Sequence, residues 1–289
     1  MPQTQSSVLS LERDGAVATL WLDRPEARNA MGRAFWADLP RAMDDVSADP
    51  EVRVVVLAAR GPHFSVGLDL KEMGSVLAGG GDAGAQAGPG TRGAARTPSP
   101  AARAAATRAA IVRMQAAVTC VATCPKPVIA AVHGYCIGGG VDLISACDIR
   151  LAAADAVFSV RETKVAIVAD LGSLQRLPLI VGSGLVAELA FTGKDVAATR
   201  AREIGLVNEV YDDHVGLWSG ARQMAEEIAA LSPLAVQGTK AVLAASQGRC
   251  VADGLDYVAA WNAGMLVSDD LAEAMTAFAE KRPPRFSGR

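Results

Sequence analysis

Three carboxylates in the middle of the chain are the residues best suited to chemistry. Asp142, Glu162 and Asp170 are spaced by twenty and then eight residues, and each lies in largely apolar sequence. Acidic side chains are seldom fully buried without a reason. A dry environment raises the pKa of a carboxyl group towards working pH, where it transfers protons efficiently. The three acids are therefore candidates for general acid–base catalysis.

A glycine cluster precedes these acids, in the segment HGYCIGGGVD that ends at Asp142. The apolar run PVIAAV before it predicts a buried strand, and the residues after it have the apolar spacing of a helix. Glycine lets the backbone approach a bound group closely, and the first turn of a helix leaves N–H groups unpaired. A strand, a glycine turn and a helix start thus predict a place that suits an anion.

Each acid also has a purely structural interpretation. A buried aspartate can cap a helix or pair with an arginine such as Arg161 or Arg176. This alternative is substantial for Asp142, because an acid in the first turn of a helix is stabilised by the helix dipole. It is the favoured interpretation of Asp148.

The segment CPKPVIAAVHGYCIGGGVDLISACDIRLA resembles the active-site core of the crotonase superfamily, the enoyl-CoA hydratases and isomerases. The likeness runs from DRPEARNAM through FSVGLDLKEM to AFAEKRPPRFSGR and fails only in one insertion. Within the superfamily the sequence is most similar to the dienoyl-CoA isomerases. The resemblance implies an α/β fold, with a crotonase-like ββα spiral core and a C-terminal all-helical trimerisation region.

The resemblance also implies an oxyanion hole for a thioester enolate. The backbone N–H groups of Leu68 and Gly139 would be its donors, and each such donor is worth about 10²–10³ in rate. Lys281, one of the residues implied to bind coenzyme A, has an equally good structural interpretation as a solvated lysine in the last turn of a helix. The residues that the resemblance assigns to coenzyme A or substrate binding are Val66, Gly67, Leu68, Asp69, Gly139, Phe278 and Lys281.

The acids distinguish two branches of the superfamily. Hydratases position a water with two glutamates; here the first is the shorter Asp142, the second remains Glu162, and Asp170 stands where hydratases usually have glycine. The resemblance therefore implies an isomerase of fatty acid degradation that converts 3,5-dienoyl-CoA to 2,4-dienoyl-CoA, with Glu162 acting at C2 and Asp170 at C6. Lys164 and Ala166 depart from the isomerase pattern, which tends to have an acid and a glycine there.

Two alternatives to the isomerase stay open. One is an enoyl-CoA hydratase that adds water to 2-enoyl-CoA, and the remote one is a non-catalytic acyl-CoA-binding scaffold. A serine hydrolase is disfavoured because the segment Gly182, Ser183, Gly184 lacks the frame of a nucleophile elbow. A dinucleotide-binding enzyme is disfavoured because no strand, GxGxxG and helix unit has an acid at the expected distance.

Composition and net charge indicate which classes of binding partner the chain can have. With 51% hydrophobic and 20% charged residues, the 289-residue chain can bury a sizeable core. A formal net charge of −3 gives no electrostatic case for nucleic acid or an acidic membrane surface. No run reaches the ~20 apolar residues of a membrane span, and no leader is evident near Met1, so a cytoplasmic protein without membrane insertion is expected.

The five cysteines are an odd number and predict reduced thiols. Cys120 and Cys124 have a spacing that metal sites use. They lie, however, in an apolar helical pattern with only His133 nearby, so small core residues are the favoured interpretation and no metal is assigned. No cofactor is expected either, because coenzyme A is part of the implied substrate.

The expected elements divide the chain into two regions. Residues 1–211 alternate strands and helices, starting with strands at 8–12 and 16–22 that Asp14 and Gly15 join, and Asn29 is a plausible N-cap for the first helix. Within this core, residues 77–103 have the composition of a low-complexity mobile loop. Residues 212–289 predict four amphipathic helices without a large core of their own, so a homotrimer or a hexamer formed as a dimer of trimers is expected.

Overall fold

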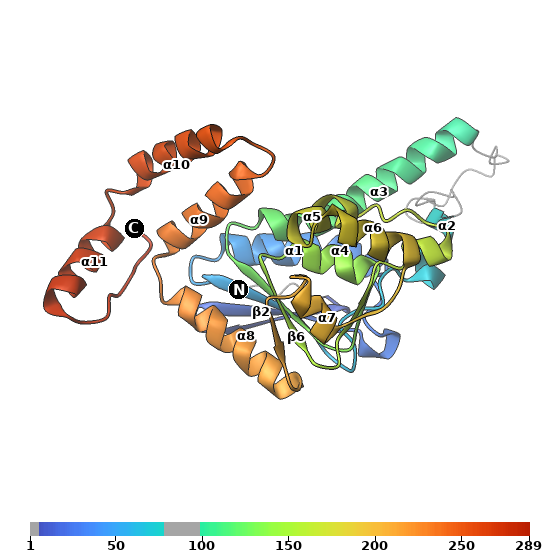
Figure 1. Ribbon diagram of the computed structural model, residues 1–289, viewed down its shortest axis with the longest axis horizontal. Helices are drawn as coiled ribbons and strands as arrows, with labels where there is room; N and C mark the ends of the chain where they lie inside the picture. The colour runs from blue at the N-terminus through green and yellow to red at the C-terminus, as the bar shows by residue number, and fades with distance from the viewer. Residues whose placement is uncertain (1–5, 78–98) are drawn as a thin grey trace, which may run out of the picture.

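The structure is a computed structural model that describes residues 6–77 and 99–289. A six-stranded sheet forms its centre (Figure 1). Across the sheet the strands are β1 (Leu9–Asp14), β2 (Val17–Leu22), β3 (Val54–Ala59), β4 (Val128–Val132), β6 (Ile149–Ala153) and β9 (Glu209–Tyr211). β1 and β2 form an antiparallel hairpin, and all later neighbours pair in parallel. Gly15 has a φ of 59°, so the predicted hairpin turn is confirmed.

Both faces of this sheet are buried, which explains its nearly continuous apolar strands. In β3, Val55 and Leu57 point to one face and Val54 and Val56 to the other, and all four are buried. Because side chains alternate along a strand, one apolar run supplies two cores. A smaller sheet lies beside the first and consists of β5 (Tyr135–Ile137), β7 (Val157–Ser159) and β8 (Val196–Ala197).

Helices cover the two faces unequally. The first face carries α1 (Arg33–Ala48), α3 (Pro100–Thr123), α4 (Gly139–Ser145), α5 (Ser173–Ile180) and α6 (Ser183–Thr192). The second face carries α8 (His214–Ala229), through Leu217, Ala221, Ala225 and Ala229 at four-residue spacing. The remaining helices of the core are η1 (Pro25–Ala27), α2 (Leu70–Leu77), η2 (Glu162–Val165) and α7 (Ala198–Glu203). The predicted α/β class with helices covering the sheet is confirmed.

Three helices extend from this core at the C-terminal end of the chain (Figure 1). They are α9 (Pro233–Ser246), α10 (Val251–Met265) and α11 (Asp269–Glu280). The predicted division between residues 211 and 212 stays a prediction, and α8, the first helix after it, packs on the sheet. No single helix in the described ranges is long and apolar enough to cross a membrane. All five cysteines are free thiols.

The expectation that Asn29 caps the first helix is wrong. α1 begins at Arg33, and Asn29 has a φ of 53°. Its side-chain amide donates to the carbonyl oxygens of Arg60 and His63, at 2.9 and 2.8 Å. Asn29 therefore connects its own loop by hydrogen bonds to the loop that carries Arg60 and His63, and it does not start a helix.

The predicted loop at residues 77–103 is also shorter than expected at both ends. Leu77 is the last residue of α2, and Pro100 is the first of α3. Ser99 caps α3, because its hydroxyl accepts from the Ala102 N–H at 3.2 Å, and proline fits the first turn of a helix. Residues 78–98 lie outside the described residues.

Candidate functional site

Two backbone turns meet at the predicted oxyanion hole. The first contains Gly67, whose φ of 83° favours glycine. A Cβ atom on Gly67 would lie 2.7 Å from the Ile137 carbonyl oxygen and 3.1 Å from the Gly139 nitrogen. A Cβ atom on Gly139 would in turn lie 3.7 Å from the Leu68 nitrogen. The structure therefore brings Leu68 and Gly139 together, and only glycine permits this approach.

The N–H groups of Leu68 and Gly139 are available to a ligand. Met31 donates to the Gly67 carbonyl at 2.8 Å and accepts from the Asp69 N–H at 3.0 Å. Since successive residues of an extended chain bond to opposite sides, the Leu68 N–H points away from Met31. Neither it nor the Gly139 N–H donates to any group within residues 6–77 and 99–289. Two adjacent unpaired donors can stabilise an oxyanion.

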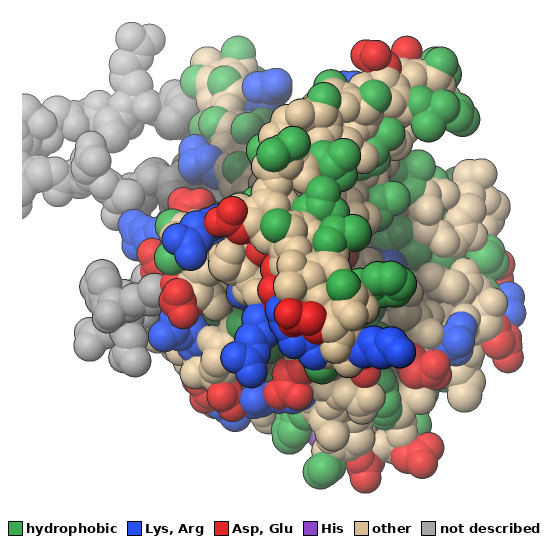
Figure 2. Space-filling view, turned by 90° about the vertical axis from the view of Figure 1, so that its left-hand side faces the viewer, with side chains coloured by type: hydrophobic (Ala, Val, Ile, Leu, Met, Phe, Trp, Pro, Cys, Tyr) green, Lys and Arg blue, Asp and Glu red, His purple; other side chains and the backbone are tan. Residues whose placement is uncertain are grey.

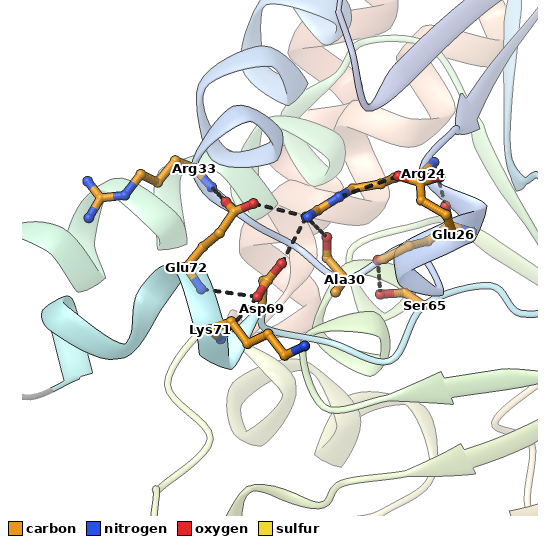
Figure 3. Close-up of polar contacts among 9 residues, drawn as sticks. Arg24, Glu26, Ala30, Arg33, Ser65, Asp69, Lys71 and Glu72 are labelled. Atoms are coloured by element: carbon orange, nitrogen blue, oxygen red, sulfur yellow. Dashed lines mark hydrogen bonds and ion pairs between the residues drawn. The ribbon is translucent and has the colours of Figure 1, made fainter.

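An ion-pair cluster holds the first turn in place (Figure 3). The Arg24 guanidinium contacts the carboxylate of Asp69 at 2.9 Å and that of Glu72 at 3.1 Å. Asp69 also accepts from the backbone N–H groups of Lys71 and Glu72 at the start of α2. The predicted coenzyme A residue Asp69 thus uses its side chain for a helix cap and an ion pair.

Glu162 lies beside the second turn. A Cβ atom on Gly138, the residue before α4, would be 3.3 Å from Glu162 Oε1. Glu162 Oε2 is buried and makes no hydrogen bond to a described residue. Burial, followed by the neighbouring charge of Asp142, raises the pKa of Glu162 from 4.5 to about 7. The structure therefore places a carboxyl group that can exchange a proton near neutral pH next to Gly139.

Asp142 is almost fully buried one turn into α4. Its Oδ1 accepts from the Ser173 N–H at 2.6 Å, at the first residue of α5. Burial raises the pKa of Asp142 to about 6, and the Ser173 N–H and the charge of Arg176 partly offset that effect. The capping function proposed as its structural alternative is therefore present.

Asp170 is half-buried in the segment between η2 and α5. Burial raises its pKa. Its charge in turn raises the pKa of both Asp142 and Glu162, so the three acids are close enough to interact. The structure brings together all three predicted carboxylates, and Ala166, at φ 59°, takes the left-handed conformation that glycine prefers in the same segment.

The C-terminal candidates lie elsewhere. Phe278 is on α11 and 84% exposed, and Lys281 follows that helix at φ 55°. In Figure 1, α11 and α2, which follows the Leu68 turn, are at opposite ends of the molecule. Within one chain, Phe278 and Lys281 are therefore not part of the cluster around Gly139.

Comparison with known proteins identifies this arrangement. The family described as enoyl-CoA hydratase/isomerase matches residues 12–87 and 76–289. The chain belongs to this family. It is 44% identical over 281 residues to the peroxisomal Delta(3,5)-Delta(2,4)-dienoyl-CoA isomerase of Arabidopsis thaliana, covering 97% of this chain and 96% of the relative. It is 42% identical over 263 residues to the mitochondrial enzyme of that name from Homo sapiens, covering 90% and 75%.

Solved structures agree with this assignment. The crystal structure of an enoyl-CoA hydratase from Bacillus anthracis has a TM-score of 0.84 and 30% identity, covering 98% of this chain and all of that one. The crotonase-like fold and the expectation of an enzyme of this family are confirmed. The expectation of a cytoplasmic protein is wrong, because the similar isomerases are named peroxisomal or mitochondrial.

Sequence reasoning missed residues that hold the family's site together. They are Arg24 and Ser65. The Ser65 hydroxyl donates to the Asn29 carbonyl at 2.8 Å and accepts from the Gly67 N–H at 3.0 Å. The motifs DRPEARNAM and FSVGLDLKEM contained the signal, since each combines one glycine or proline turn with polar residues.

Proposed function

We propose that this chain is a dienoyl-CoA isomerase that converts 3,5-dienoyl-CoA to 2,4-dienoyl-CoA in fatty acid degradation. The observation that carries the proposal is the group of three interacting carboxylates beside two unpaired N–H groups. The isomerase names of relatives at 42–44% identity support it.

The first step removes a proton from C2. The thioester carbonyl oxygen would accept hydrogen bonds from Leu68 and Gly139, which stabilises the negative charge that develops on it. Glu162, as a carboxylate, would take the C2 proton, and the C–H electron pair passes into a dienolate. Its pKa of about 7 suits a base that works near neutral pH.

The second step delivers a proton to C6. Asp170, in its protonated form, would supply this proton. The thioester carbonyl reforms at the same time, and the double bonds now start at C2 and C4. The substrate gains one proton and loses one, so the reaction is balanced. Asp142 would hold the start of α5 and keep the Glu162 pKa high through its charge. No separate cofactor takes part, because coenzyme A is carried by the substrate.

We infer further that the chain assembles as a trimer or a dimer of trimers through its C-terminal helices. Their exposed side chains include Leu243, Val251, Leu255, Val267 and Met275. Figure 2 faces these helices and shows hydrophobic side chains gathered over its upper half. Contact with a neighbouring subunit would cover them and would bring Phe278 and Lys281 to a bound coenzyme A.

Asp170→Asn separates the isomerase from the hydratase. The amide keeps the shape of the side chain but cannot donate the acidic proton, so isomerisation of a 3,5-dienoyl-CoA should fall by about 10²–10⁴, with little change in KM. Absorbance of the conjugated 2,4-dienoyl thioester measures the rate. Glu203→Gln, at an exposed ion pair with Arg200, is the control and should keep full activity.

Three results would contradict the proposal. One is full activity of Asp170→Asn on the diene. The second is rapid hydration of 2-enoyl-CoA by the parent protein without isomerisation of the diene, which would favour the hydratase. The third is absence of both reactions with acyl-CoA bound, which would favour the non-catalytic scaffold.

A further inference from the structure

Few hydrogen bonds hold the segment that carries Asp170. At its start the Ile167 N–H donates to the Glu162 carbonyl at 3.0 Å. From residue 168 to residue 172, no backbone N–H donates to another residue in the part of the chain that the structure describes. The Asp170 carboxylate likewise makes no hydrogen bond to another described residue. The buried side chains of Ala169 and Leu171 anchor the segment in the core, and hydrogen bonds to its carbonyl groups are the polar contacts that remain to fix Asp170.

One side chain on α3 reaches such a carbonyl group directly, and a second reaches the next one through Arg176. Gln115 Nε2 donates to the Asp170 carbonyl oxygen at 2.7 Å. One turn later, Thr119 Oγ1 accepts from Arg176 Nη2 at 3.1 Å, and Arg176 Nη1 donates to the Leu171 carbonyl at 3.3 Å. Residues four apart share a face of a helix, so one face of α3 holds two successive carbonyls of the segment.

Gly172 makes the contact between Arg176 and the Leu171 carbonyl possible. Its φ of 126° favours glycine, and a Cβ atom there would lie 1.8 Å from Arg176 Nη1. Any side chain at position 172 would therefore displace the guanidinium from the Leu171 carbonyl. Arg176 therefore links α3 to the backbone of the segment, and the absence of a side chain at Gly172 leaves room for it.

We propose that Gln115 and, through Arg176, Thr119 are positioning residues that fix where the Asp170 carboxyl group stands along the acyl chain. This inference rests on the proposed isomerase function. A single neutral hydrogen bond contributes little to the stability of a whole domain, so the fold survives its loss. A displacement of about 1 Å at a reacting group can nevertheless cost about 10² in rate.

Gln115→Met removes the amide donor but keeps the length of the side chain and a good helix former. It should lower kcat on a 3,5-dienoyl-CoA by about 10- to 100-fold, because Asp170 shifts, and should leave KM within about 2-fold. Thr119→Val should lower kcat several-fold, and Thr119→Ser, which keeps the hydroxyl, should restore it. Thr123→Val is the matched control, since among the described residues the Thr123 hydroxyl bonds only to the Thr119 carbonyl of its own helix.

Proton exchange at C2 distinguishes a positioning role of Gln115 from a general loss of activity in the variant. In deuterated water, Glu162 alone should exchange the C2 hydrogen of the bound substrate. Gln115→Met should keep this exchange near the parental rate while isomerisation falls. An equal loss of exchange and isomerisation, or full isomerisation by Gln115→Met, would overturn the inference.

The outcome also separates this inference from the function on which it rests. If Asp170→Asn is impaired and Gln115→Met is not, only the positioning inference fails. If the parent protein does not isomerise the diene, or if Asp170→Asn is fully active, the proposed function fails and the inference fails with it.

Discussion

Replacing Glu162 with glutamine should greatly lower the isomerase activity and yet make the protein more stable above neutral pH. Glu162 Oε2 is buried and has no hydrogen-bond partner in the part of the chain that the structure describes, and burial together with the charge of Asp142 raises the pKa of the side chain from 4.5 to about 7. The folded protein thus holds the ionised carboxylate at a cost that the unfolded chain does not have.

The pKa of the folded state sets the size and sign of the effect. Below pH 4.5 both states carry the proton, and Glu162 does not change the free energy of unfolding. Between pH 4.5 and about 7 the unfolded chain loses its proton first, so stability falls as the pH rises. A pKa difference of this size corresponds to about 3 kcal/mol, which Glu162→Gln should recover above pH 8.

Urea unfolding at pH 4.5, 6, 7 and 8 tests this expectation. Protein concentration must be the same throughout, because assembly would couple stability to concentration. The free-energy difference between variant and parent should grow by about 3 kcal/mol from the lowest pH to the highest, while isomerisation falls by about 10²–10⁴. A difference that stays constant with pH would refute the reasoning. Glu203→Gln, on the surface, should show no such trend.

Two further predictions follow from other regions. Burial lowers the pKa of His133, so as the pH falls the unfolded chain binds a proton before the folded protein does. The free energy of unfolding should therefore fall as the pH drops below about 6.5. His133→Gln should lose less of this free energy than the parent protein between pH 8 and pH 5, as measured by unfolding. Val267 is 97% exposed after α10, and Val267→Asp should lower the assembled mass in light scattering, whereas Glu203→Gln should not.

The sequence predicted the parts of the fold that depend on local pattern. Apolar runs predicted the strands that correspond to β1, β2 and β4, and the periodicity after residue 212 predicted four helices, which correspond to α8, α9, α10 and α11. The helices α5 and α6 were missed. Each is at most ten residues long, α5 contains Pro178, and Gly172 and Gly182 precede the two helices, so local signals resembled those of a loop.

The site was predictable in its residues but not in its connections. The spacing of the acids and the resemblance to the family identified Asp142, Glu162 and Asp170. The contact between Arg24 and Asp69 spans 45 residues, and that between Gln115 and Asp170 spans 55. Such contacts arise only when the sheet and α3 bring distant segments together, and no local pattern in a single sequence reports them.

The surroundings of the carboxyl groups, more than their chemical identity, give them different roles. Asp142 is buried, and Glu162 is half-buried with its Oε2 enclosed. Asp142 has the Ser173 N–H and the nearby charge of Arg176, whereas Glu162 Oε2 has no partner among the described residues. Burial raises the pKa of both acids, to about 6 for Asp142 and about 7 for Glu162, and the Ser173 N–H and Arg176 counteract the effect at Asp142. An acid that keeps its charge can hold α5, and an acid that readily gains and loses a proton can carry out the chemistry.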